Sequence, residues 1–146
     1  MDSSHSNVLA IDFGEKRIGL ARGFSGLKFA SPLTTIETGA DVFNRLASII
    51  DQEQIGLIVV GRPINSAGNE TDQTRHTVNF VEDLKQHTKI PIIWQEETLT
   101  SVKAEQELAD RGKPYKKGEV DALAATYILE DYLETSATSA SRTSNV

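Results

Sequence analysis

The chain contains no cysteine, which excludes disulfide bonds and metal sites built from thiolates. It has no apolar run long enough to cross a bilayer, and the segment from Met1 to Asn7 is polar, so we expect neither a membrane span nor a signal peptide. Basic residues are outnumbered by acidic ones, and the formal net charge of −6 argues against the strongly basic surface typical of nucleic-acid-binding domains. We therefore expect a cytoplasmic protein that does not associate with membranes.

The length and composition are those of one globular domain. At 146 residues, with 38% hydrophobic and 25% charged residues, the chain is long enough to bury its own core. The polar start and the Ser/Thr-rich end lack any apolar pattern, so we expect residues 1–7 and 135–146 to be disordered. The folded domain should span residues 8–134.

Apolar periodicity predicts an α/β domain. Short apolar runs indicate five strands, and spacings of three and four indicate four helices, the first capped by Thr38. The order β-β-β-α-β-α-β-α-α predicts a mixed five-stranded sheet, a meander followed by α/β crossovers, with helices on both faces. The strands are expected at about residues 8–11, 18–22, 27–33, 55–60 and 90–94, and the later helices at about 71–87, 100–112 and 117–133.

Acidic residues follow two of the apolar strands. Asp12 ends the first strand, and Glu96 and Glu97 follow the strand that ends at Trp94. Sites in open α/β sheets gather at the carboxyl ends of the parallel strands, although Asp and Gly are also ordinary turn residues. Because side chains alternate along an extended segment, only one of the two glutamates should point toward Asp12. The other would be a solvated acid.

Asp121 is the third acid of interest. On the last predicted helix it shares a face with Ala124, Ala125 and Ile128, so a lone carboxylate lies on an apolar face. It could simply stabilise the helix N-terminus, but a solvent-facing acid would serve that purpose equally well. Three converging carboxylates would bind a hard cation, Mg²⁺ or Mn²⁺, of the kind that supports phosphodiester hydrolysis.

Four motifs together resemble the YqgF (RuvX) family over about residues 8–133. They are Asp12-Phe13-Gly14-Glu15-Lys16-Arg17-Ile18-Gly19, Gly61-Arg62-Pro63, Glu96-Glu97-Thr98-Leu99-Thr100-Ser101 and Lys116-Lys117-Gly118-Glu119-Val120-Asp121-Ala122-Leu123-Ala124-Ala125. The resemblance implies an RNase H-like fold and a nuclease that trims the 5′ end of the 16S rRNA precursor. It also implies that Asp12, Glu97 and Asp121 are the metal-binding, catalytic acids.

Two positions depart from the family pattern. Thr98 stands where an arginine is expected, and Arg62 stands where the family usually has leucine. Neither change removes an implied metal ligand. Loss of the arginine puts one phosphate or structural contact in doubt, and Arg62 is a candidate replacement for it.

Basic residues cluster next to the acidic motifs. Positive side chains beside a metal site suit a phosphate backbone, although the run from Arg111 to Lys117 could equally be a solvated connector. The expected nucleic-acid contacts are Lys16, Arg17, Arg62, Arg75, Lys113, Lys116 and Lys117.

The residues leave several functions open. The leading hypothesis is a nuclease acting on structured RNA, the 16S rRNA precursor, free or in a ribosomal particle. Branched DNA is an alternative substrate, since resolvases of Holliday junctions use the same chemistry, and either a monomer or a homodimer would suit. The first motif also resembles the phosphate loop of sugar kinases and actin-like ATPases, but one short domain cannot enclose a nucleotide as their two domains do. A non-catalytic RNA-binding module remains open.

Overall fold

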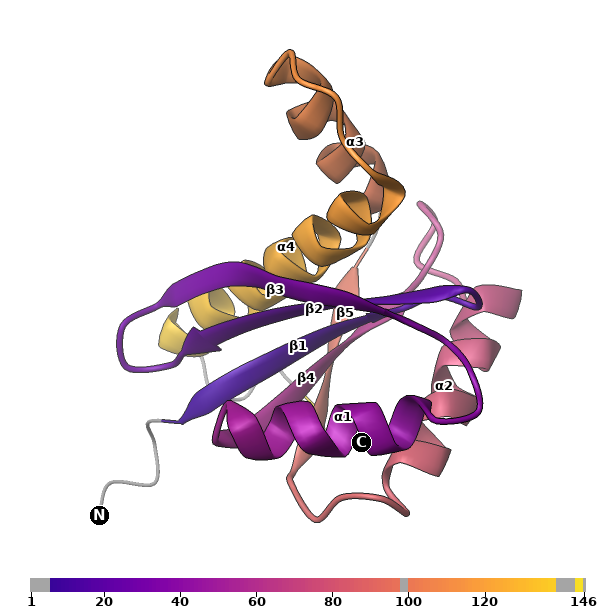
Figure 1. Ribbon diagram of the computed structural model, residues 1–146, viewed down its shortest axis with the longest axis vertical. Coiled ribbons are helices and arrows are strands. Elements are labelled where there is room, and N and C mark those ends of the chain that lie inside the picture. The colour runs from indigo at the N-terminus through magenta and orange to yellow at the C-terminus, as the bar shows by residue number, and fades with distance from the viewer. Residues whose placement is uncertain (1–5, 98–99, 139–143, 146) are drawn as a thin grey trace.

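The computed structural model describes residues 6–97, 100–138 and 144–145, and its centre is a mixed sheet (Figure 1). The strands are β1 (Asn7–Phe13), β2 (Arg17–Phe24), β3 (Phe29–Glu37), β4 (Ile55–Pro63), β5 (Ile92–Glu97) and the two-residue β6 (Ser144–Asn145). Their order across the sheet is β3-β2-β1-β4-β5-β6. The β1–β2 and β2–β3 pairs are antiparallel, whereas β4 pairs in parallel with β1 and with β5. The predicted five-stranded sheet is confirmed, and β6 adds a short strand beside β5.

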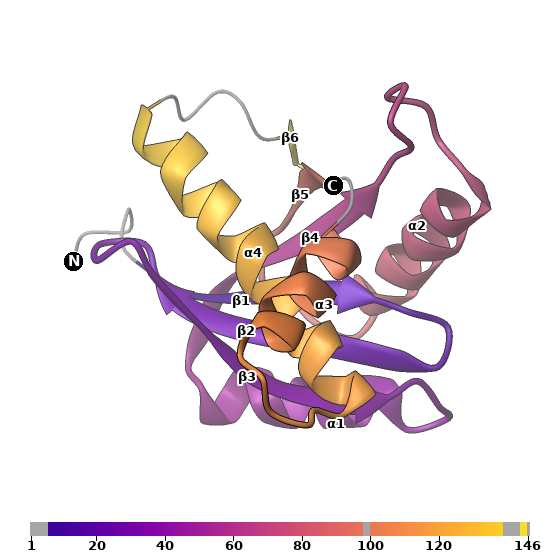
Figure 2. The ribbon, with the colours of Figure 1, turned by 90° about the horizontal axis from the view of Figure 1, so that it is seen from above.

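Helices cover both faces of this sheet, as predicted. The helices are α1 (Val42–Gln52), α2 (Asp72–Leu84), α3 (Thr100–Asp110) and α4 (Lys117–Thr138). Helices α1 and α2 pack on one face in a core with Leu9, Ile11 and Ile58, and α4 packs on the other with Val8 and Ala10. Helix α3 lies against α4 instead of the sheet, through a smaller apolar cluster (Figure 2).

The faces follow from strand alternation. In β1, Leu9 and Ile11 point toward α1 and α2, so the alternate residues Val8 and Ala10 point toward α4. All four are fully buried, which explains the continuous apolar run in the sequence. Within the described ranges, no helix is both long enough and apolar enough to span a membrane.

The predicted cap of the first helix is wrong. Asp41 occupies the N-cap of α1 and makes no capping hydrogen bond through its side chain. The hydroxyl of Thr38 donates instead to the carbonyl of Gly14, 2.8 Å away, in the turn after β1. The hydroxyl of Thr38 is therefore used in a tertiary hydrogen bond and does not cap α1. Helix α2 begins as predicted, because Thr71 forms a capping box with Thr74.

Several element ends differ from the predicted ones. Helix α2 ends at Leu84, three residues early, and α4 continues to Thr138, five residues beyond the predicted end. Strands β4 and β5 extend through Pro63 and Glu97, because pairing of the two strands continues to these residues. The helical residues 135–138 and the paired residues 144–145 therefore differ from the predicted disordered tail. Residues 1–5, 139–143 and 146 of the predicted disordered ends lie outside the described residues.

Candidate active site

Alternation places Asp12 and Glu97 on the α4 side of the sheet. Asp12 follows Ala10 by two residues in β1, and Glu97 follows Ile93 by four in β5, and both of these apolar residues pack under α4. Glu96 points to the opposite side and is exposed. The expectation that only one of the two glutamates turns toward Asp12 agrees with this arrangement.

Glu97 is held in an environment that disfavours its charge. Burial raises the pKa of its carboxyl to about 9, aided by a hydrogen bond to the Asp131 carboxyl and by the negative charges of Asp131 and Asp12, against the opposing charge of Lys103. Its Oε1 atom is buried and has no hydrogen-bond partner within the described residues. An unsatisfied buried oxygen is costly, so this atom marks a place where a ligand would be stabilised.

The surroundings of Asp12 also disfavour the ionised form of its carboxyl. Burial raises its pKa to about 7, and the negative charge of Asp121 contributes further. Asp12 therefore interacts electrostatically with both of the other predicted acids, Asp121 and Glu97. A nearby cation would relieve both pKa shifts, because it stabilises the ionised carboxylates.

Asp121 is positioned by close contact between α4 and β2. A Cβ atom built on Gly19 would lie 1.9 Å from the carbonyl oxygen of Asp121, so only glycine allows this approach. The carboxylate of Asp121 accepts a hydrogen bond from Nε of Arg17, 2.7 Å from Oδ2. Asp121 thus lies on the sheet-facing side of α4, as its spacing predicts, but it is paired with an arginine.

The turn after Asp12 is tied down from two directions. Gln73 of α2 donates to the carbonyl of Phe13 at 3.0 Å, and Thr38 donates to the carbonyl of Gly14. His76, also on α2, forms an ion pair with Glu15 when it is protonated. These contacts fix the chain on both sides of the first candidate ligand.

The three acids supply the oxygen ligands that a hard divalent cation prefers, but in the described structure their side chains are not arranged around a common metal position. All three supply carboxylate oxygens, and the unpartnered Oε1 of Glu97 fits a ligand atom. Across residues 6–97, 100–138 and 144–145, however, no three His, Asp or Glu side chains lie close enough together to hold a metal ion. The carboxylate of Asp121 instead forms an ion pair with Arg17.

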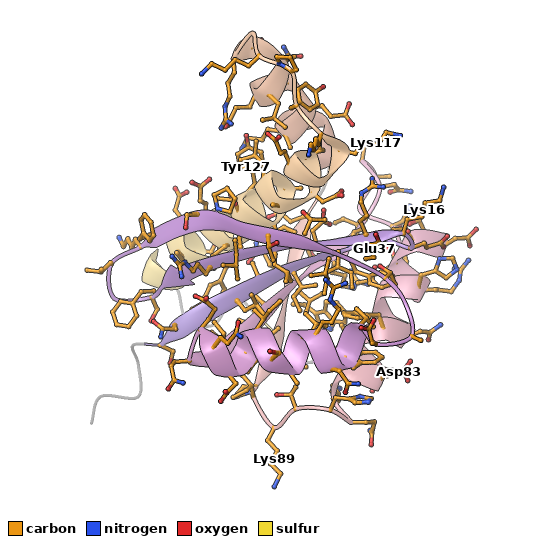
Figure 3. The ribbon with its side chains drawn as sticks, in the orientation of Figure 1. Lys16, Glu37, Asp83, Lys89, Lys117 and Tyr127 are labelled. Atoms are coloured by element: carbon orange, nitrogen blue, oxygen red, sulfur yellow. The ribbon has the colours of Figure 1, made fainter. Side chains whose placement is uncertain are left out.

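The predicted nucleic-acid contacts divide into paired arginines and lysines without carboxylate partners. Arg62 lies between Glu70 and Glu96, 2.8 Å from the latter, and Arg75 pairs with Asp72 of its own helix. No ion pair is formed, among the described side chains, by the exposed residues Lys16, Lys113, Lys116 and Lys117. Figure 3 shows Lys16 and Lys117 projecting from the same side of the molecule.

Sequence reasoning missed Asp131 and the environment of Lys103. Asp131 lies ten residues after Asp121, outside the i+3 and i+4 pattern that singled out the latter, yet it contacts Glu97. The amine of Lys103 lies 4.5 Å from the centre of the Tyr127 ring, and its charge acts on Glu97. The packing of α3 against α4 brings Lys103 to Tyr127, whereas Asp131 reaches Glu97 because α4 also contacts β5.

Solved structures with a similar fold include RuvC. The chain matches Thermus thermophilus RuvC in complex with a Holliday junction substrate with a TM-score of 0.58 and 16% identity, covering 96% of this chain and 99% of that one. A second structure of Thermus thermophilus RuvC matches with a TM-score of 0.55 and 15% identity, over the same shares of the two chains. At such identity the likeness shows the fold alone, and it confirms the expected RNase H-like fold.

Curated relatives match nearly the whole chain. A protein of Sulfurihydrogenibium sp., named as a candidate pre-16S rRNA nuclease, is 39% identical over 131 residues, covering 88% of this chain and 90% of that protein. One of the same name from Maridesulfovibrio salexigens is 39% identical over 130 residues, covering 86% and 96%. The profile of the RuvX family, described as Holliday junction resolvase, matches residues 6–135. The chain belongs to the RuvX family.

Proposed function

We propose that this protein is a divalent-metal-dependent nuclease that processes the 5′ end of the 16S rRNA precursor in the cytoplasm. Residues 8–134 would form the nuclease domain, and Asp12, Glu97 and Asp121 would hold Mg²⁺ or Mn²⁺. Family membership and the names of the relatives support the activity and the substrate. The observation that carries the site is the buried Oε1 of Glu97, which has no hydrogen-bond partner among the described residues and lies on the same side of the sheet as Asp12.

The chain's own residues would prepare this site for a cation. Asp12 and Glu97 are desolvated acids whose ionisation is unfavourable without a positive partner, so they favour binding of a divalent ion. The bound metal would activate water and stabilise the oxygen that leaves during phosphodiester hydrolysis. Gln73 and Thr38 would keep Asp12 in place, because they hold the turn that follows it.

The basic side chains would position the phosphate backbone beside the acids. Lys16, Lys113, Lys116 and Lys117 are exposed and can offer their charge to phosphates without first breaking an ion pair of the described structure. Arg62 and Arg75 would have to leave carboxylate partners to do so. We therefore assign the main phosphate contacts to the lysines.

The test is cleavage of a labelled RNA that carries the 5′ end of precursor 16S rRNA, with Mn²⁺, Mg²⁺ or EDTA. We expect metal-dependent cleavage by the wild type and its loss in Asp12→Asn, Glu97→Gln and Asp121→Asn. Glu96→Gln is the matched control, since Glu96 is the neighbouring acid but faces the other side of the sheet. Full activity in Asp12→Asn would reject the assigned site.

A four-way DNA junction belongs in the same assay, because the family's description names this substrate. Preferential cleavage of the junction would change the proposed substrate from RNA to branched DNA and would leave the assignment of the catalytic acids unchanged. A folded wild type that cleaves neither substrate should be given a precursor ribosomal particle. If it still fails, and binds RNA equally with and without metal, the protein is a non-catalytic RNA-binding module.

A further inference from the structure

The carboxylate of Asp121 is the one candidate ligand that pairs with a basic side chain in the described structure. Arg17 opens β2, and its Nε donates to Oδ2 of Asp121 at 2.7 Å. Neither Asp12 nor Glu97 forms an ion pair within residues 6–97, 100–138 and 144–145. The guanidinium therefore neutralises one ligand of the proposed metal site, whereas the other two have no ion-pair partner among the described residues.

The backbone around Asp121 has no room to adjust. Gly19 touches the carbonyl of Asp121, and the hydroxyl of Thr35 on β3 donates to the carbonyl of Gly118 at 2.5 Å. The first turns of α4 are thus held against β2 and β3. Any change in the position of the Asp121 carboxylate must come from rotation of its side chain, and Arg17 restrains that rotation.

The Arg17–Asp121 pair is strong enough to position the carboxylate and weak enough to be exchanged. The Arg17 side chain is 37% exposed and that of Asp121 is 19% exposed. Ion pairs with this degree of solvent access contribute little net stability, because water competes for both partners. A divalent ion with two further carboxylates beside it would offer Asp121 a stronger partner.

We propose that Arg17 is a positioning residue that holds the Asp121 carboxylate in the metal-free protein and competes with the divalent cation for it. The metal site is then completed only when Asp121 exchanges Arg17 for the metal ion. This exchange agrees with two observations on the described residues: Asp121 pairs with Arg17, and no three acidic side chains lie close enough together to hold a metal ion. The inference rests on the proposed function, since it takes the three acids as metal ligands.

The test measures Mn²⁺ binding to the full chain without nucleic acid, by electron paramagnetic resonance of the free ion. We expect Arg17→Gln to bind Mn²⁺ about two- to fivefold more tightly than the wild type, because the competing pair is gone. Arg22→Gln is the matched control: Arg22 lies on the same strand and pairs with Glu53, 2.5 Å away. Its Mn²⁺ affinity should equal that of the wild type.

An Asp121→Asn background separates competition for this carboxylate from a general effect of charge. There Arg17→Gln should leave Mn²⁺ affinity unchanged, because nothing remains to compete for. Equal tightening in both backgrounds would overturn the inference, as would unchanged or weaker Mn²⁺ binding by Arg17→Gln alone. Should Arg17→Gln fail to fold, Arg17→Met takes its place, because it also removes the charge, and wild-type affinity in that variant overturns the inference.

The same measurement distinguishes failure of this inference from failure of the proposed function. If Asp12→Asn abolishes Mn²⁺ binding while Arg17→Gln leaves it unchanged, the metal site stands and Arg17 has no part in it. If neither the wild type nor any folded variant binds Mn²⁺, the proposed metal-dependent nuclease falls, and this inference falls with it.

Discussion

At the scale of single residues, the candidate acids are defined by the cost of their ionisation. Asp12 and Glu97 have raised pKa values, about 7 and about 9, mainly because both carboxyls are buried. Structural acids on protein surfaces do not need such an environment, whereas groups that bind cations or protons often have it. Asp121 differs, since it obtains its positive partner from Arg17 within the same chain.

These shifts predict that the metal-free protein loses stability as the pH rises. A carboxyl whose pKa is raised on folding binds its proton more tightly in the folded state, so stability falls from the unfolded pKa up to the folded one. For Asp12 this window runs from 3.8 to about 7, and for Glu97 from 4.5 to about 9. In EDTA, we expect the free energy of unfolding to fall by at least about 2 kcal/mol between pH 5 and 8.5.

Urea unfolding at a series of pH values measures this slope. Asp12→Asn should reduce the slope below about pH 7, and Glu97→Gln should reduce it up to about pH 9, where Glu97 alone contributes above pH 7. Glu96→Gln, an exposed neighbour, should leave it unchanged. A wild-type slope of zero across this range would mean that neither carboxyl is held protonated by the fold.

At the scale of elements, the contact between α4 and β2 sets the position of Asp121. Replacing Gly19 by alanine would put Cβ 1.9 Å from the Asp121 carbonyl, inside the distance that atoms tolerate. Because the added atom on β2 would meet backbone atoms of α4, which cannot rotate away, the helix must move. We expect Gly19→Ala to lose about 3 kcal/mol or more of stability. Gly39→Ala is the control, since nothing lies within 4 Å of its added atom. Thermal melts of equal midpoint for both variants would contradict this account.

We expect the lysines at the start of α4 to contribute to binding of the RNA phosphates. Lys116 and Lys117 are exposed, and they lie directly before and at the first residue of the helix that bears Asp121. Lys28 and Lys89 lie on other connections, and Figure 3 shows Lys89 far from Lys117. The double variant Lys116→Gln/Lys117→Gln should weaken RNA binding and reduce the slope of log affinity against log salt by about 0.7 to 0.9 per lost contact. Lys28→Gln/Lys89→Gln removes the same charge and should preserve the slope. Equal losses in the two pairs would mean that binding follows net charge alone.

The sequence predicts elements more accurately than it predicts contacts. The continuous apolar run of β1 and the spacing of residues in α4 suffice to predict a buried strand that ends at Asp12 and an apolar helix face that carries Asp121, because each pattern is local. The pairing of Arg17 with Asp121 joins residues 104 positions apart and leaves no local trace. Thr38 is a second example: its hydroxyl donates a hydrogen bond to the carbonyl of Gly14 in the turn after β1 and does not cap α1, although its position in the sequence predicts a cap.

At the scale of the whole molecule, the fold gathers costs that only a ligand can relieve. The parallel pairing of β1, β4 and β5 brings Asp12 and Glu97 to the same end of the sheet, and α4 adds Asp121 from above it. Buried carboxyls, and an oxygen of Glu97 without a hydrogen-bond partner among the described residues, destabilise the free protein. The same features would make metal binding favourable, so stability and function are linked through one site.

This linkage predicts that a divalent metal ion stabilises the folded chain. At a free Mn²⁺ concentration of about 100 times Kd, binding contributes about 2.7 kcal/mol, which corresponds to a rise in Tm of roughly 5–15 °C for a domain of this size. The rise should be largest near pH 8, where the metal-free carboxyls are most costly, and smallest near pH 5, where protons compete with the metal. Differential scanning fluorimetry with Mn²⁺ and with EDTA measures it. Asp12→Asn should abolish the rise and Glu96→Gln should keep it, and a rise of equal size in both would place the metal elsewhere on the protein.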